Sequence, residues 1–254
     1  MSNNNRIKAN IFGVAINSGR KSALLTDILS KVSSGNKPCL VFTPNPAFIL
    51  QAQNDVKFKE LLNQADINLP DGFGFILFNK ILKWGINARV AGSDIVKDLL
   101  TIANKEKWRV GLAGMRNGVV SEVNEQIRRL KSQYPNVVFF DLAKHQVLLQ
   151  RNPASGGIIN TEQYQLILAC HGMGKQEKWI WENKDKYNAG VMMGVGGSLD
   201  FLTGFTKRAP VFIQKFGLEW LWRVGQKPSH YKRALQSVFG FSWLVVRNKL
   251  SADK

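Results

Sequence analysis

The chain has 254 residues, of which 44% are hydrophobic, so it can bury the core of one large domain and does not have a disordered composition. Its 35 Lys and Arg residues against 18 Asp and Glu residues give a net charge of +17, which favours a polyanionic partner such as nucleic acid, anionic lipid or a phosphorylated substrate. Cys39 and Cys170 have no paired spacing, which argues against a disulfide framework. We find no signal-peptide profile and no apolar run of the ~20 residues that span a bilayer, so we expect a protein of the cytosol or of a membrane's inner face.

Strand and helix signals alternate along the chain. Strands are predicted at 10–16, 38–43, 109–113, 136–140, 165–170 and 190–195, and helices at 22–33, 47–63, 92–106, 118–132, 174–186 and 198–203. This alternation predicts an α/β fold with a Rossmann-like, largely parallel sheet flanked by helices. In such sheets, ligands bind at the carboxyl ends of the strands.

Three polar clusters lie close together in the first half of the chain. They are Val-Phe-Thr-Pro-Asn-Pro at 41–46, Leu-Pro-Asp-Gly-Phe-Gly at 69–74 and Ala-Arg-Val-Ala-Gly-Ser-Asp at 88–94. Each follows a short apolar run and is rich in Pro, Gly or Asn, so each is typical of a strand that opens into a shaped loop. We therefore expect the three loops to build one site.

Two glycine clusters indicate phosphate binding. Gly111–Gly118 follows the strand residues Arg109–Val110, and Gly194–Asp200 follows the strand residues Val191–Met193, each with small residues before a helix. Backbone N–H groups can approach an anion there without a Cβ in the way. The alternative is that the glycines only permit tight turns between strand and helix.

Gln176 and Glu177 fall in the first turn of a predicted amphipathic helix that follows the apolar strand 166–170. An amide at the edge of the sheet can bind a base or a sugar, and a carboxylate suits the positive end of the helix dipole. Helix capping is the alternative for both side chains.

The last fifth of the chain is a specialised element, because residues 205–254 carry ten Lys and Arg against Glu219 and Asp253. Taking Pro210 as the first helical residue, apolar side chains recur every four residues, at Phe212, Phe216, Trp220 and Val224. The pattern predicts a core domain over 1–204 and a basic amphipathic helical appendage over 205–254 that lies on an anionic membrane surface. A helix packed on the core is the alternative, and the apolar stretch 238–246 could also lie in an interface.

Six ordered blocks carry a resemblance to a known family. They are Thr43-Pro-Asn45-Pro, Pro70-Asp71-Gly72-x-Gly74, Arg89-Val-Ala-Gly92-x-Asp94, Lys175-Gln176-Glu177-Lys-Trp179, Gly194-x-Gly196-Gly197-x-x-Asp200-Phe, and Lys207-Arg208-Ala-Pro210 through Gly217-Leu-Glu219-Trp220-Leu-x-Arg223. Over roughly residues 38 to 235 the chain resembles glycosyltransferase family 26. That family includes the teichoic-acid N-acetylmannosaminyltransferase and the enterobacterial-common-antigen N-acetylmannosaminuronic acid transferase.

The resemblance implies a GT-E type fold and an inverting hexosyltransferase. The enzyme would move N-acetylmannosamine or N-acetylmannosaminuronic acid from a UDP-sugar to a polyprenyl-diphosphate-linked N-acetylglucosamine in cell-surface polysaccharide biosynthesis. It would act as a peripheral protein on the inner face of the bacterial cytoplasmic membrane. Transfer of another hexose such as glucose, in capsule or exopolysaccharide assembly, and a catalytically silent nucleotide-sugar-binding protein are the alternatives. We find no signature of nucleic-acid binding, and the oligomeric state, including a homo-oligomer, stays open.

The resemblance also assigns catalytic roles. Asp71 would be the base that takes the proton of the attacking hydroxyl, with an Asx-type turn as its structural alternative. Thr43 and Asn45 would position substrate, although a rigid turn would use the same residues. Arg89 would bind the donor's phosphates, unless it forms an ion pair with Asp94 or another acid.

The remaining assignments concern the donor and its diphosphate. Gln176, Asp200 and the loop glycines Gly194, Gly196 and Gly197 would form the donor side, and Arg223 and Arg233 would close the site. His230 stands where the family commonly has arginine. Because the chain has no Asp-x-Asp pair and only three scattered histidines, we expect no metal and no cofactor, with arginines and backbone amides neutralising the diphosphate.

Overall fold

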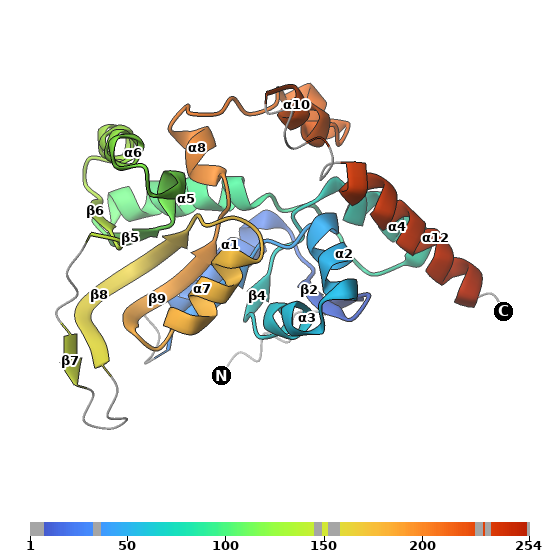
Figure 1. The fold of residues 1–254 in the computed structure, drawn as a ribbon, viewed down its shortest axis with the longest axis horizontal. Coiled ribbons are helices and arrows are strands. Elements are labelled where there is room, and N and C mark those ends of the chain that lie inside the picture. Colours follow the sequence, from blue (N-terminus) through green and yellow to red (C-terminus); the bar gives the residue numbers. More distant parts are fainter. Residues whose placement is uncertain are drawn as a thin grey trace.

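A parallel sheet forms the centre of the molecule. The computed structural model describes residues 8–32, 37–144, 149–151, 158–226, 231 and 235–252. Six parallel strands run in the order β4-β3-β9-β8-β5-β6, with bounds Ile67–Asn68 (β4), Cys39–Phe42 (β3), Tyr187–Gly194 (β9), Ile158–Ala169 (β8), Arg109–Ala113 (β5) and Val138–Asp141 (β6) (Figure 1). β7 (Leu149–Arg151) pairs antiparallel with β8. The predicted α/β fold with a largely parallel sheet is confirmed.

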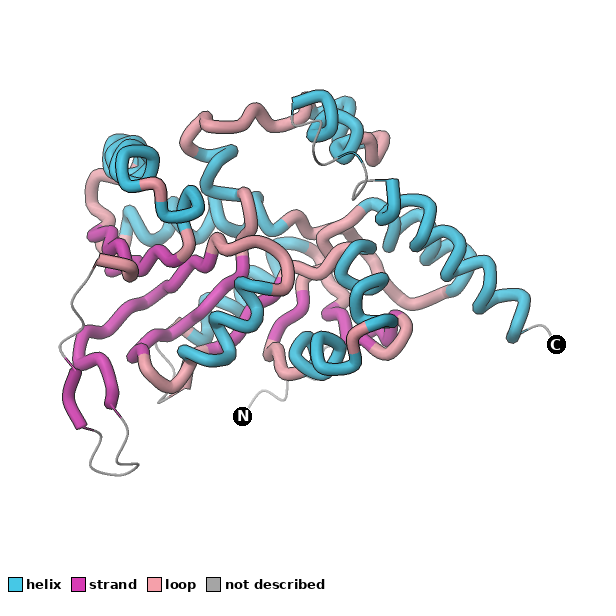
Figure 2. Tube along the Cα trace, in the orientation of Figure 1, coloured by secondary structure: helices cyan, strands magenta, loops and turns pink. Residues whose placement is uncertain are grey.

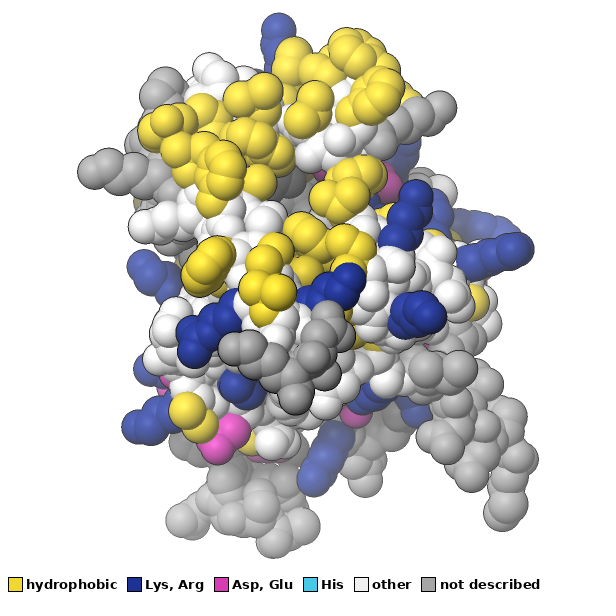
Figure 3. Space-filling view, turned by 90° about the vertical axis from the view of Figure 1, so that its right-hand side faces the viewer, with side chains coloured by type: hydrophobic (Ala, Val, Ile, Leu, Met, Phe, Trp, Pro, Cys, Tyr) yellow, Lys and Arg dark blue, Asp and Glu magenta, His cyan; other side chains and the backbone are white. Residues whose placement is uncertain are grey.

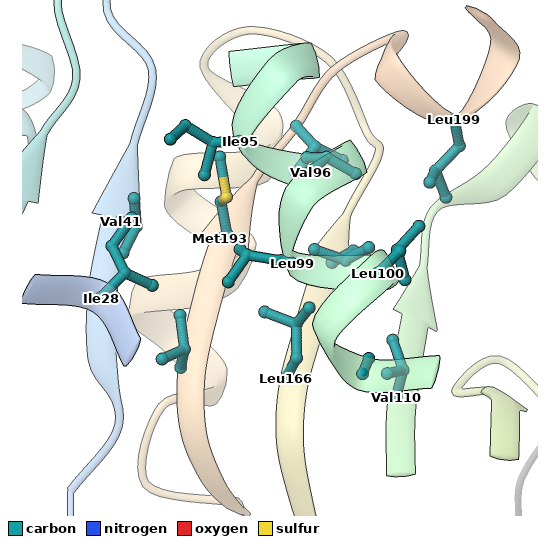
Figure 4. Packing of buried hydrophobic residues seen from close by; sticks show 14 of the residues in the cluster. Ile28, Val41, Ile95, Val96, Leu99, Leu100, Val110, Leu166, Met193 and Leu199 are labelled. Carbon is teal, nitrogen blue, oxygen red and sulfur yellow. The ribbon is translucent and has the colours of Figure 1, made fainter. Parts of the chain in front are cut away.

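Four helices cover one face of the sheet. They are α1 (Lys21–Lys31), α5 (Gly92–Lys105), α6 (Val120–Gln133) and α8 (Ser198–Leu202). α5 packs on the strands, and its Ile95, Val96, Leu99 and Leu100 lie in one layer with the strand side chains Val110, Leu166 and Met193 (Figure 4). This stripe has the i, i+3, i+4 spacing of an amphipathic helix, so the helix buries it against the sheet.

The opposite face is covered by a second group of helices. They are α2 (Pro46–Asn54), α3 (Val56–Asn63), α4 (Phe73–Leu82), α7 (Lys175–Asn183) and α12 (Phe241–Ala252). Phe42, Ile167 and Met192 supply the strand side of this core, because successive strand residues point to opposite faces. Phe241 begins α12 and is 1% exposed, with its ring against Phe75 and Phe78 of α4. α12 is therefore anchored to the core at its first residue.

Several elements differ from the sequence predictions. The strand predicted at 10–16 is a hairpin of β1 (Lys8–Ile11) and β2 (Val14–Asn17), because Phe12 and Gly13 turn the chain with φ of 50° and 86°. The helix predicted at 47–63 is broken at Asp55, whose carboxylate accepts a hydrogen bond of 3.0 Å from Phe58 N and so caps α3. α4, β4 and β7 were not among the predicted elements. The strand expected before the cluster at 88–94 is wrong, because residues 83–91 form an irregular segment.

The C-terminal part also departs from the predicted single stripe. Pro210 is the N-cap of a short α9 (Val211–Lys215), and the chain turns before α10 (Glu219–Gln226) begins. Gly217 makes this turn with φ of 74°, and a Cβ there would collide with the ring of Phe73. The residues Phe212 and Phe216 are therefore not on one continuous helix with Trp220 and Val224.

α10 lies beyond the carboxyl ends of the strands, on a long connection that follows α8 (Figure 1). Figure 2 shows the loops that leave the strands gathered at that same end of the sheet. The division into a core over 1–204 and an appendage over 205–254 stays a prediction. Among the helices in the described ranges, none combines the length and the apolar character that a membrane span requires.

Candidate active site

Asp71 lies in the loop between β4 and α4 and is held from several directions. Its backbone N–H donates to Leu69 O at 2.8 Å and to Pro44 O at 3.0 Å, which joins the loop to the one that follows β3. Its carboxylate Oδ2 accepts from the backbone N–H of Gly92 at 3.0 Å. Gly92 is the first residue of α5, so the helix dipole stabilises the charge on Asp71. A carboxylate positioned in this way is preorganised to accept a proton.

Thr43 packs against Gly92, whose backbone N–H holds this carboxylate. Thr43 is 8% exposed, and its hydroxyl donates to Gly194 O at 3.2 Å, which links β3 to β9. A Cβ on Gly92 would lie 2.7 Å from Thr43 Cγ2 and 3.5 Å from Asp71 Oδ2. The glycine therefore allows α5 to approach closely enough for its first N–H to reach Asp71. The predicted loops at 41–46, 69–74 and 88–94 therefore meet at this point.

An ion-pair cluster surrounds Asp71 on the side of α10. Arg89 forms an ion pair with Glu219 of α10, and its Nη2 lies 3.7 Å from Asp71 Oδ1. Arg208 Nη1 donates to Asp94 Oδ1 at 2.5 Å, and Arg208 Nε lies 4.0 Å from Glu219 Oε1. Burial opposes ionisation of Asp94, but the hydrogen bond from Arg208 and nearby cations outweigh it and hold the pKa of Asp94 below its usual value.

Gln176 holds the glycine loop that follows β9. It is 2% exposed, its Oε1 accepts from Gly196 N at 2.8 Å, and its Nε2 donates to Glu177 Oε1 at 2.7 Å. A Cβ on Gly194 would lie 2.8 Å from Gln176 Nε2, so the amide packs flat on the loop. Gln176 thus shapes the Gly194–Gly197 backbone, and its role toward a donor stays a prediction.

Glu177 caps α7 from inside the protein. Its Oε2 accepts from the backbone N–H of Gly174 at 2.7 Å, and the side chain is fully shielded from solvent. Burial raises the pKa of Glu177 to about 7, although the hydrogen bonds from Gln176 and from backbone N–H groups act in the other direction. The capping alternative for Glu177 is therefore realised in the structure.

Asp200 lies in a different cluster from Asp71. Its Oδ2 pairs with Arg116 Nη1 at 3.0 Å, and its Oδ1 accepts from Gln126 Nε2 at 2.9 Å. Arg116 belongs to the 3-10 turn η1 (Met115–Gly118) and has φ of 44°, a strained value for a residue with a side chain. Asp200 and this turn flank the ends of β9 and β5, where the sequence predicts phosphate binding by the glycines.

Asn45 is the N-cap of α2, and its Oδ1 accepts from Ala47 N at 2.9 Å. The structure thus places Asn45 beside Thr43 and gives its carbonyl oxygen a structural partner. The side chain of Arg223, together with all of Arg233 and His230, lies outside the described residues. Their predicted closure of the site stays a prediction.

A cavity of about 790 Å³ lies between α2 and the π-helical turn η3 (Gln236–Gly240). Leu50, Gln51, Met173 and Phe239 are among its lining residues. Its described lining is of mixed polarity and includes none of the residues that surround Asp71. Within the described ranges, no group of three or more His, Cys, Asp and Glu side chains could hold a metal ion, and independence from metal stays a prediction.

Sequence reasoning did not assign Arg208 or Glu219 to the site. Both lie in quoted blocks, and both belong to the cluster that contains Arg89. A signal for Glu219 was available, because it is one of two acids among ten cations in residues 205–254. An isolated acid in so basic a segment is expected to have a specific basic partner.

Comparisons with known proteins identify the family of the chain. The family model described as "Glycosyl transferase WecG/TagA/CpsF family" matches residues 9–254. A relative from Bacillus spizizenii is 30% identical over 219 residues, which is 86% of this chain and 83% of that protein, and one from Bacillus subtilis is 30% identical over 196 residues, which is 77% and 75%. One from Staphylococcus aureus is 29% identical over 257 residues, which is 98% and 96%. All three are named N-acetylglucosaminyldiphosphoundecaprenol N-acetyl-beta-D-mannosaminyltransferase. With a family model that spans nearly the whole chain and a carboxylate site at the carboxyl end of its sheet, this protein is a glycosyltransferase that belongs to the WecG/TagA/CpsF family.

Proposed function

We propose that this enzyme transfers N-acetylmannosamine from a UDP-linked donor to N-acetylglucosamine on a polyprenyl diphosphate. The names of the relatives support the transferred sugar and the acceptor. N-acetylmannosaminuronic acid and glucose are the competing sugars. The observation that carries the proposal is Asp71, whose carboxylate is held at 3.0 Å by the N-terminal amide of α5 beside a guanidinium.

The reaction is an inverting displacement at the anomeric carbon. A hydroxyl of the acceptor sugar attacks this carbon, and the bond from the carbon to the β-phosphate oxygen breaks, so that UDP leaves with the bonding electrons. Asp71 accepts the proton of the attacking hydroxyl. Arg89 supports the departing diphosphate because a guanidinium forms short, charge-assisted hydrogen bonds with phosphate oxygens.

The supporting residues keep this geometry in place. Thr43 ties the β3 loop to Gly194, and Gln176 orients the next amide of the same loop through Gly196. Asp200 and Arg116 would hold the nucleoside end of the donor, and Arg223 and Arg233 would close the site over the diphosphate. A neutral side chain at His230 would alter that closure.

The enzyme works at an anionic membrane surface, because its acceptor carries a long lipid. Large apolar side chains are exposed on the C-terminal helices, including Phe212 at 62%, Phe216 at 71% and Trp243 at 68%. Figure 3 shows hydrophobic side chains gathered on this face with Lys and Arg side chains around them. Apolar groups that enter the headgroup region, together with cations near anionic lipid, hold a protein peripherally.

The test is UDP release from a panel of UDP-sugars with a synthetic prenyl-diphosphate-linked N-acetylglucosamine, in the presence of EDTA. We expect turnover with the N-acetylmannosamine donor, resistance to EDTA and a β-linked product by NMR. Asp71→Ala and Asp71→Asn are expected to lower kcat by about a hundredfold or more, because the general base is lost.

Asp98→Asn is the matched control, since Asp98 is a carboxylate on α5 that pairs with Lys21 at the surface. It should leave turnover unchanged. Full activity of Asp71→Asn would remove Asp71 from the mechanism. Donor binding by the wild type without turnover of any donor would favour a silent nucleotide-sugar-binding protein.

A further inference from the structure

Two guanidinium groups converge on one carboxylate beside the candidate base. Arg89 pairs with Glu219, and Arg208 Nε lies 4.0 Å from the other oxygen of the same carboxylate. The side chains of Arg89, Arg208 and Glu219 are 21%, 28% and 16% exposed, so the cluster is partly withdrawn from water. Arg89 comes from the loop before α5, whereas Arg208 precedes α9 and Glu219 begins α10.

Both guanidiniums keep an unused donor inside the protein. Arg89 Nε and Arg208 Nε are buried and have no hydrogen-bond partner within the described part of the chain. A buried donor without an acceptor is unfavourable, and a guanidinium can place five N–H groups around an anion. Because both Nε–H groups lack an acceptor among the described residues while Glu219 is in place, the cluster suits a ligand with more oxygens than a carboxylate has.

The charges show which group has to leave when such an anion binds. Arg89 and Arg208 face Asp71, Asp94 and Glu219, so the cluster already has one more acid than base. Asp71 is fixed by the backbone N–H of Gly92, the first residue of α5. Asp94, in the first turn of the same helix, is paired with Arg208. Glu219 instead belongs to α10, which follows the left-handed turn at Gly217. Its carboxylate is the one that can be withdrawn without disturbing the core.

We infer that Arg89 and Arg208 form a two-guanidinium site for a diphosphate, and that Glu219 occupies this site until the ligand displaces it. The inference rests on the proposed function and adds Arg208 as a diphosphate ligand and Glu219 as its competitor. The diphosphate belongs either to the nucleotide donor or to the prenyl acceptor, because both carry the same group. Displacement of Glu219 frees α10 to move as the site fills.

Isothermal titration calorimetry of the full chain tests this with three probes: inorganic pyrophosphate, UDP and a short-chain prenyl diphosphate. Losing one charge-assisted contact should make Arg208→Gln bind pyrophosphate about ten- to a hundredfold more weakly than the wild type. Glu219→Gln should bind it about tenfold more tightly, because the competing charge is gone. Arg128→Gln and Glu182→Gln, two exposed residues with local partners, are the matched controls and should bind as the wild type does.

The two organic probes identify the source of the diphosphate. If the affinity for UDP changes across the variants as the affinity for pyrophosphate does, the site binds the diphosphate of the donor. If the affinity for prenyl diphosphate changes in this way instead, the site binds the diphosphate of the acceptor. Arg208→Lys keeps the charge toward Asp94 but lacks the planar fork, so it replaces Arg208→Gln if that variant does not fold.

Unchanged pyrophosphate affinity in the Arg208 variants, or no gain in Glu219→Gln, would overturn the inference. The same holds if neither the wild type nor Glu219→Gln binds pyrophosphate. Sugar transfer is measured separately, so its outcome is independent. If the wild type transfers sugar but the variants bind pyrophosphate as the wild type does, only this inference is rejected. If the variants bind pyrophosphate in the expected order but no sugar is transferred, only the proposed function is rejected.

Discussion

Glu177 is a carboxyl group whose ionisation conflicts with its burial. Burial raises its pKa from the ordinary value of 4.5 to about 7, so the folded protein binds the proton more tightly than the unfolded chain does. The stability that this group contributes is therefore fully present below pH 4.5 and is lost as the pH rises through about 7. Glu177→Gln removes the titration and should remove this loss.

The measurement is urea unfolding of both proteins between about pH 5 and pH 8, followed by tryptophan fluorescence. At about 1.4 kcal/mol per pH unit, the unfolding free energy of the wild type should fall by roughly 3 kcal/mol relative to Glu177→Gln. Glu182→Gln lies on the same helix with an exposed side chain, and it should keep the wild-type pH dependence. Parallel pH profiles for the wild type and Glu177→Gln would contradict the assignment.

Single residues near Asp71 show what a linear pattern can and cannot predict. The sequence predicts that Asp71, Thr43 and Arg89 share one site, because each lies in a loop that was expected to follow a strand of a parallel sheet. Thr43 and Asp71 do follow β3 and β4, whereas Arg89 lies in an irregular segment before α5. It does not predict that Gly92 N bonds Asp71, since this contact depends on a helix start and a loop that meet only in the fold. Arg208 and Glu219 were missed for the same reason, as their partners lie more than a hundred residues away.

At the scale of the element, α2 begins at a residue with two expected functions. Asn45 caps the helix through Oδ1, which accepts from Ala47 N at 2.9 Å, and its amide nitrogen is the group that can donate to a substrate. Asn45→Asp keeps the capping oxygen but loses the donor. Asn45→Ala loses both groups.

We expect Asn45→Asp to unfold at the same urea concentration as the wild type, while sugar transfer falls. Asn45→Ala should lose about 1 kcal/mol of stability as well, which is the usual cost of removing a cap. Urea unfolding and steady-state transfer kinetics on the same preparations separate the two functions. If Asn45→Asp keeps full activity, Asn45 is a structural residue only.

The element boundaries that were mispredicted share a physical cause. A continuous apolar periodicity suggested one helix over 47–63 and one from Pro210 onward, yet both break where a local interaction ends the helix. At Asp55 a side chain caps the next helix, and at Gly217 the turn brings the backbone against Phe73. Over 47–63 the period of the apolar residues identified the buried face, whereas the stripe after Pro210 begins with exposed side chains. In both segments the stops depend on capping and on contacts across the fold.

At the scale of the whole molecule, the layered fold follows from the order of the elements. Strands alternating with helices require crossovers, which produce a parallel sheet with helices on both faces, as observed. The order of the strands is not encoded in this alternation: β9 lies between β3 and β8, although it comes last in the chain. This order places Gly194 beside Thr43 and therefore completes the site.

The net charge of +17 and the exposed apolar face of the C-terminal helices both support the proposed binding to an anionic membrane. Phe216 and Trp243 are 71% and 68% exposed, and they belong to the C-terminal part of the chain that Figure 3 shows to be rich in apolar side chains. Transfer of each ring into the headgroup region contributes about 1.5–3 kcal/mol. We expect the wild type to bind vesicles that contain anionic lipid and to dissociate as salt increases, because exposed charges are screened.

The double variant Phe216→Ser, Trp243→Ser should bind such vesicles about a hundredfold more weakly or worse in a sedimentation assay. Its turnover with a water-soluble short-chain acceptor should stay at the wild-type level, since both side chains are largely exposed and neither is assigned to the reaction. The control is Val56→Ser, Val120→Ser, which removes two apolar side chains of 66% and 56% exposure from α3 and α6. Equal vesicle binding by the two double variants would show that the C-terminal face does not hold the enzyme at the membrane. Loss of turnover on the soluble acceptor would instead mean that these helices take part in the chemistry itself.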